Sequence, residues 1–147
     1  QVLAEVKRHA GWGFLLVTAD DVAQSELPAP SDALPTHAAI AERAETASSL
    51  ALENREAAFL LLWSALEGLL RRLAVRTSLP VERLPTSTLV KHLYTHGELS
   101  MDRFDRVMAA LEVRNHVAFG YEFRDIDPAL HALTSLVDDL LAEDGGE

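Results

Sequence analysis

Apolar side chains recur with a helical period along most of the chain after Pro35. The clearest case is the segment 56–77, where apolar residues follow one another at i, i+4, i+7, i+11 and i+14, a spacing that predicts a long helix. This helix is apolar almost all round, so we expect it to be the central helix of a bundle, or to form a dimer interface as well. Its stripe consists of Phe59, Trp63, Leu66, Leu70 and Leu73, widened by Leu61, Leu62, Ala65 and Leu69.

Two further helices are predicted on either side of this segment. The first begins after Thr36 or Ser31, either of which is a suitable N-cap, and runs to about Asn54. A short helix follows a loop at 80–87 and stops before Gly97, because glycine commonly ends a helix. The candidate N-caps of the short helix are Thr86, Ser87 and Thr88.

Two more helices complete the pattern. One covers about 101–118, with Ser100 as its N-cap and Gly120 placed to end it. The last opens at 127–128, with proline at the first helical position, which suits this residue. Long antiparallel helices with short links form a bundle. The predicted fold is therefore mainly α, an antiparallel helical bundle over residues 36–143.

The amino-terminal segment has a different pattern. Residues 1–19 show a period of two on either side of a Gly-Trp-Gly turn, which predicts a short β-hairpin. Residues 20–35 contain three prolines among polar residues and are predicted to be a linker.

Composition restricts the possible functions. The 147 residues contain no cysteine, so a thiolate metal site is excluded, and no apolar run is long enough to cross a membrane. His92 and His96 are an i, i+4 pair without a nearby carboxylate, which is more typical of surface residues than of zinc ligands, so no metal site is predicted. The chain begins with Gln and shows no signal peptide, and we expect it to be part of a longer cytoplasmic protein.

The formal net charge of −10 disfavours loose binding to nucleic-acid phosphates, which depends on Lys and Arg. A local basic site is still compatible with this charge. The basic residues cluster at Lys7-Arg8, at Arg71, Arg72 and Arg76, and at Arg103, Arg106 and Arg114.

The segment 114–121, Arg-Asn-His-Val-Ala-Phe-Gly-Tyr, resembles the Arg-Asn-x-x-x-His-Gly signature of the HEPN superfamily of helical RNases and nucleic-acid-associated domains. The stretch Ser64 to Glu67 is similar to the Ser-Ala-Leu-Glu sequence found in the second helix of such domains, and the likeness covers about residues 37–142. The resemblance implies a helical bundle that dimerises. In its active members it implies metal-independent RNA cleavage by an arginine and a histidine at the dimer interface.

On this resemblance Arg114 and Asn115 match the signature, but Phe119 stands where the histidine is expected. Histidine moves a proton near neutral pH and arginine stabilises phosphate charge, whereas phenylalanine cannot transfer a proton. His116 is the nearest substitute, but at about 100° per residue it lies roughly 200° around the helix from Arg114. We therefore carry Arg114, Asn115 and His116 forward as candidate catalytic residues of a site that has lost its principal base.

Structural roles are open for the same residues. Arg114 is expected to pair with Glu67 or Glu112, so these three are candidate binding residues. His116 is expected near the helix end, where Glu112 at i−4 is a candidate partner. Phe119 shares a face with Leu111 and Phe104, which predicts a core or dimer-interface aromatic.

Glu5 and Lys7 form a Glu-x-Lys pair on one face of the first predicted strand. Their surroundings resemble the end of a restriction-endonuclease-like module of the AHJR-like group, which is found joined to HEPN-type domains. In that resemblance the glutamate binds Mg²⁺ and the lysine polarises water. The upstream metal-binding aspartate is missing from the chain, so no cofactor is expected unless an intact upstream module supplies Mg²⁺.

These sequence features lead to three hypotheses about the function. The first, which we favour, is a non-cleaving HEPN-like homodimeric interaction module that accompanies a nuclease-like domain in a defence or toxin–antitoxin setting, with RNA or protein as partner. The second is a metal-independent endoribonuclease that uses Arg114 with a relocated histidine. The third is the helical tail of a metal-dependent DNase.

Overall fold

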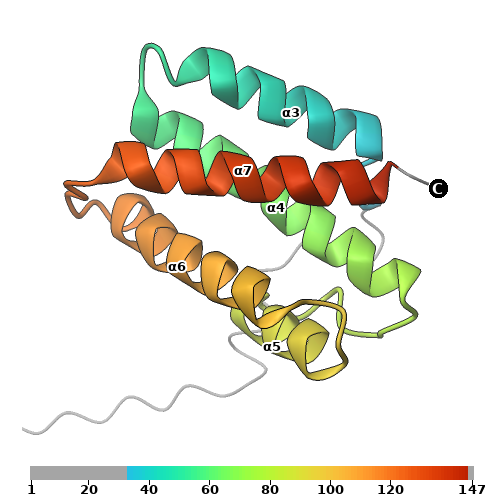
Figure 1. Ribbon diagram of the computed structural model, residues 1–147. Helices are drawn as coiled ribbons and strands as arrows, with labels where there is room; N and C mark the ends of the chain where they lie inside the picture. Colours follow the sequence, from blue (N-terminus) through green and yellow to red (C-terminus); the bar gives the residue numbers. More distant parts are fainter. Residues whose placement is uncertain (1–32, 146–147) are drawn as a thin grey trace, which may run out of the picture.

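The computed structural model describes residues 33–145, and this part of the chain consists of five helices without a strand (Figure 1). The helices are α3 (His37–Leu50), α4 (Arg55–Arg76), α5 (Thr86–Thr95), α6 (Met101–Ala118) and α7 (Ile126–Asp144). The predicted hairpin at 1–19, with Glu5 and Lys7, lies outside the described residues, as does nearly all of the predicted linker. The predicted helical bundle is confirmed.

Helix α4 is at the centre of this bundle. It contacts α3, α5, α6 and α7, and within residues 33–145 it is the one helix that contacts all the others. Figure 1 shows α3 and α7 side by side, α4 behind α7, and the short α5 below α6. The apolar stripe of α4 is thus used inside the bundle, which is the first of the two roles predicted for it. No helix in this part of the chain is both long and apolar enough to span a membrane.

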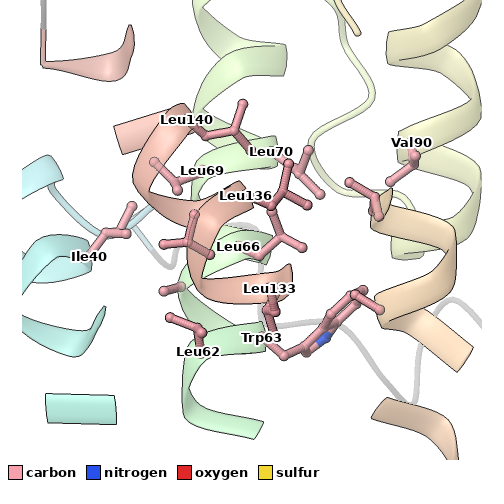
Figure 2. Packing of buried hydrophobic residues seen from close by; sticks show 14 of the residues in the cluster. Ile40, Leu62, Trp63, Leu66, Leu69, Leu70, Val90, Leu133, Leu136 and Leu140 are labelled. Carbon is pink, nitrogen blue, oxygen red and sulfur yellow. The ribbon is translucent and has the colours of Figure 1, made fainter. Parts of the chain in front are cut away.

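The core forms where α4 meets α7. Leu66 and Leu70 of α4 are fully buried, as are Leu133 and Leu136 of α7, and Figure 2 shows these side chains between the two helices. Each fully buried leucine stabilises the fold by about 1.5–3 kcal/mol relative to an exposed position. The buried face of α7, formed by Leu133, Leu136, Val137 and Leu140, therefore packs on the near-continuous stripe of α4.

The N-caps confirm two of the predicted boundaries. Thr36 caps α3, its side chain accepting a hydrogen bond from the Ala39 amide at 3.2 Å, and Ser100 caps α6 in the same way through the Arg103 amide at 3.3 Å. Helix α3 ends at Leu50 rather than Asn54, because Asn54 is instead the N-cap of α4.

The prediction that a hydroxyl side chain caps α5 is wrong. The N-cap is Pro85, and no side-chain cap is made there. The Thr86 hydroxyl instead donates a hydrogen bond to Glu67 Oε1 on α4. The Thr86 hydroxyl, which local sequence rules assign to the N-terminus of α5, therefore bonds to a distant part of the chain instead.

The turn between α6 and α7 is built on Gly120. This residue has φ +80°, a left-handed conformation that favours glycine, and the Tyr121 amide donates to His116 O at 2.8 Å across it. Helix α7 begins at Ile126, so Pro128 is its third residue rather than the first as predicted. Proline is tolerated there because the first-turn amides have no partner within the helix.

The carboxylate of Asp144 joins three helices at the other end of the bundle. It contacts His37 Nδ1 at 3.0 Å, Arg72 Nε at 2.9 Å and Arg76 Nη1 at 3.4 Å, and its own side chain is almost fully buried. Burial acts to raise the pKa of Asp144, but the hydrogen bonds from Arg72 and His37 and the nearby positive charges outweigh it, so this pKa lies below its ordinary value.

Candidate functional site

A cleft of about 770 Å³ opens where the middle of α4, the start of α5 and the end of α6 meet. It brings together Arg114 and Asn115, which the sequence singled out, with Glu67 from the Ser-Ala-Leu-Glu stretch. The remaining lining residues are Arg71, Pro85, Thr86, Ser87, Leu111, Ala118 and Phe119.

Arg71 fixes the wall of this cleft. Its Nη1 donates to the backbone carbonyls of Glu82 at 2.5 Å and Leu84 at 3.0 Å, and so ties the loop before α5 to α4. Burial lowers the pKa of Arg71, and the carboxylate of Glu67 acts in the opposite direction. The guanidinium keeps its charge at neutral pH, so the cleft holds a partly buried cation.

Arg114 contributes a second guanidinium from α6. Its Nη1 donates to Asn115 Oδ1 at 3.0 Å. It makes no ion pair with Glu67 or Glu112 within the described residues, although Glu67 lines the same cleft. Asn115 thus orients the arginine without neutralising it, and Glu112 is exposed outside the cleft.

His116 lies outside the cleft, as the helical geometry predicted. Its Nδ1 donates to the Glu112 backbone carbonyl at 2.9 Å, and its ring meets those of Tyr121 and Phe123 edge-on, with centroids 6.4 Å and 5.7 Å away. None of the histidines in residues 33–145 lines the cleft. The described cleft therefore holds no imidazole beside Arg114.

Phe119 is 72% exposed at the edge of the cleft, next to the 68% exposed Tyr121. The prediction that Phe119 is a core residue is wrong, because α6 ends there and the chain turns away at Gly120. Its other predicted role, as an interface aromatic, is the subject of the proposal below.

A second hollow of about 310 Å³ adjoins the cleft, since Glu67 and Arg71 line both. Arg43 of α3 reaches it and donates from Nη1 to Ser64 Oγ at 2.8 Å. One wall is apolar, formed by Leu34 and Pro35 before α3. The other lining residues are Ala33, Gly68, Glu82 and Arg83.

The described part of the chain holds no group of three or more potential metal ligands. His92 and His96 are both exposed on α5, with ring centroids 6.2 Å apart, and no third ligand joins them. This pair therefore has the arrangement of surface residues.

Sequence reasoning missed Arg43, Arg71 and Thr86 as parts of the site. Arg71 was visible only as a member of a basic cluster with Arg72 and Arg76. Adjacent helical residues lie about 100° apart, and the two neighbours indeed face different surroundings, Arg71 in the cleft and Arg72 at Asp144. The one available signal was the position of Arg71 four residues after Glu67, which places both on one face of α4.

Comparison of the chain with protein-family models, with curated proteins and with solved structures gave no match.

Proposed function

We propose that residues 36–143 form a HEPN-like module that self-associates and binds a partner without cleaving RNA, beside a nuclease-like domain in a defence or toxin–antitoxin setting. The observation that carries this proposal is the exposure of Phe119 at the edge of a cleft that also holds Arg114. A catalytic arginine is present in the motif, but the position expected to hold its proton-transfer partner is aromatic.

The absence of a proton-transfer histidine from the described cleft supports the loss of cleavage. RNA cleavage through the 2′-hydroxyl needs a group that accepts and returns a proton near neutral pH. His116 is turned toward Tyr121 and Phe123 on another side of the helix, and its Nδ1 is occupied by a backbone carbonyl. An arginine and an asparagine alone bind an anion and leave the proton transfer without a carrier.

The exposed aromatic pair supports self-association. Phe119 and Tyr121 stand on either side of Gly120, and exposed aromatic side chains in a cluster are typical of interfaces. In a two-fold dimer the same turn of each copy meets its counterpart, so both copies contribute the same exposed rings to the interface. Because α4 is already covered by the other four helices, we place the interface at the α6–α7 turn.

Light scattering after size exclusion at tens of micromolar tests this proposal. We expect a dimer for the wild-type chain and a monomer for Phe119→Asp. The matched control is Met101→Asp, which places the same charge on a 56% exposed residue at the other end of α6 and should remain dimeric. A wild-type monomer, or a Phe119→Asp variant that still dimerises, would refute the proposed interface.

A second measurement addresses cleavage separately. The wild-type chain and Arg114→Ala are incubated with a mixed-sequence RNA in EDTA, and neither is expected to cut it. Cleavage by the wild type that disappears in Arg114→Ala would show a working RNase and overturn the non-cleaving assignment, whatever the oligomeric state.

A further inference from the structure

The arginines of the described chain differ in what their guanidinium groups contact. One group forms ion pairs with carboxylates: Arg55, Arg72, Arg76, Arg103 and Arg106. A second group makes its hydrogen bonds to neutral oxygens, from Arg43 to Ser64, from Arg114 to Asn115, and from Arg71 to two backbone carbonyls and to the Thr86 hydroxyl at 3.5 Å. Within residues 33–145, the second group thus has no direct carboxylate counter-ion.

All three members of the second group line the two adjoining hollows, which together are called the arginine groove. Arg43, Arg71 and Arg114 outnumber the two glutamates that also line it, Glu67 and Glu82, a formal excess of one positive charge before Arg83 is counted. The whole chain carries a formal charge of −10, so the groove has the opposite sign to the molecule around it.

We propose that the arginine groove binds an acidic peptide segment of a partner protein. Carboxylates of the segment contact Arg43 and Arg114 at the two ends of the groove and Arg71 between them. Its apolar side chains pack against the apolar walls, formed by Leu34 and Pro35 in one hollow and by Leu111 and Ala118 in the other.

The partial burial of the guanidinium groups supports a carboxylate ligand. Arg43, Arg71 and Arg114 are all partly buried, so each has lost some hydration without gaining an ionic partner. A carboxylate matches the planar guanidinium through two parallel hydrogen bonds, and charge-assisted bonds of this kind are about twice as strong as neutral ones. Along α4, Ser64, which holds Arg43, and Arg71 are roughly 10 Å apart, so the groove matches a ligand with several separated charges.

The same residues favour a peptide over a nucleic acid. A nucleic acid carries one charge per nucleotide, and the chain's overall charge of −10 repels such a dense polyanion. Glu67 and Glu82 line the groove together with the arginines and would repel a continuous phosphate backbone, whereas a peptide can place an amide or an apolar side chain beside them. The aliphatic walls also fit leucine-sized side chains.

This inference goes beyond self-association, because it concerns a different partner. The hollow beside Arg43 does not include Phe119, so a peptide there is compatible with a second copy at the α6–α7 turn. Failure of the dimer test would leave the groove unaffected, and failure of the peptide test would leave the dimer interface unaffected.

Fluorescence anisotropy with three labelled probes tests the proposal on the whole chain. The probes are a twelve-residue peptide of Glu-Glu-Leu repeats, the neutral peptide with Gln in place of Glu, and a twelve-nucleotide oligouridylate. We expect the acidic peptide to bind most tightly, and its affinity to fall as salt rises because screening weakens the charge contacts.

Matched variants locate the site. Arg43→Gln and Arg114→Gln should each weaken the acidic peptide by roughly three- to tenfold. Arg106→Gln removes the same charge from an arginine that is already paired with Asp102 and Asp139, and should leave binding unchanged. Arg43→Lys, which keeps the charge but not the two parallel hydrogen bonds, should weaken binding less than Arg43→Gln, and thermal melting confirms that each variant is folded.

Several outcomes would overturn the proposal. They are the absence of acidic-peptide binding, equal binding of the neutral peptide, and equal weakening by Arg106→Gln and Arg43→Gln. Tighter binding of oligouridylate would assign the groove to nucleic acid instead. The comparison of the three probes uses only the wild-type chain, so it decides the ligand class even if a variant fails to fold.

Discussion

The hydroxyl of Thr86 donates a hydrogen bond to Glu67 Oε1, across 19 residues of sequence, and joins the first residue of α5 to the middle of α4. Thr86 is buried, so this contact holds the start of α5 in the wall of the cleft. Together with the bonds from Arg71 to the loop before α5, it fixes the shape of the site that Arg114 completes.

Thr86→Val tests this contact because it removes the hydroxyl at nearly constant volume. We expect the free energy of unfolding to fall by about 1–2 kcal/mol, since a buried hydrogen bond to a carboxylate is lost. Urea denaturation measures the change. Thr86→Ser keeps the donor and should lose less. A larger loss in Thr86→Ser than in Thr86→Val would show that the methyl group, rather than the hydroxyl, stabilises this position.

Asp144→Asn tests the carboxylate that joins α3, α4 and α7. The pKa of Asp144 is depressed below its ordinary value of 3.8, so its stabilising effect is complete above that value and is lost as pH falls through the folded-state pKa. At pH 7 the variant should unfold with about 1–3 kcal/mol less free energy than the wild type. This difference should shrink below about pH 4.

Urea denaturation across pH measures that difference. Glu143→Gln is the control, because Glu143 is half exposed and its pair with Arg103 should contribute less than about 1 kcal/mol. A difference between the wild type and Asp144→Asn that stays constant from pH 7 to pH 3 would contradict an ionic role for Asp144.

Gly120→Ala tests the turn that follows α6. No atom lies within 4 Å of the position a Cβ would take, so the cost comes only from the backbone, which has φ +80°. We expect a loss of about 1 kcal/mol, measured by thermal or urea unfolding. Asn tolerates this conformation better than Ala, so Gly120→Asn should lose less. If the two substitutions lower the free energy of unfolding equally, backbone strain at this position does not explain the loss.

Phe119→His tests the proposed loss of catalysis directly. The substitution places an imidazole at the edge of the cleft beside Arg114, and general acid–base catalysis contributes about 10²- to 10⁴-fold to a rate. Because the acidic chain and the glutamates of the groove disfavour RNA, we expect the variant to remain inactive on RNA in EDTA. A gain of about two orders of magnitude that is lost on adding Arg114→Ala and kept on adding His116→Ala would show that the cleft accepts RNA and lacks only its base. That outcome would contradict the assignment of the groove to a peptide.

The helices could be predicted from sequence because their signals are local. The stripe of α4 and the N-caps Thr36 and Ser100 involve residues within a few positions of one another. The same rules predicted the wrong N-cap for α5, because the Thr86 hydroxyl donates a hydrogen bond to Glu67 on another helix. No local sequence pattern indicates such a contact.

The candidate site was only partly predictable for a related reason. The sequence motif placed Arg114 and Asn115 correctly on α6, and helical geometry excluded His116 from their side. The exposure of Phe119 depends on where the chain leaves the bundle after α6, and the choice of partner by each arginine depends on how the helices pack. Neither the exposure of Phe119 nor the partner of an arginine can be predicted from the spacing of residues along one helix.

The contact between His37 and Asp144 also decides how this domain can be joined to others. His37 is the first residue of α3 and Asp144 the last of α7, so the chain enters and leaves the bundle at one corner, near the point marked C in Figure 1. A short linker is enough to join the start of α3 to the end of α7. The bundle is therefore suited to insertion into a loop of another domain, and to circular permutation with new ends in the exposed turn at Leu52.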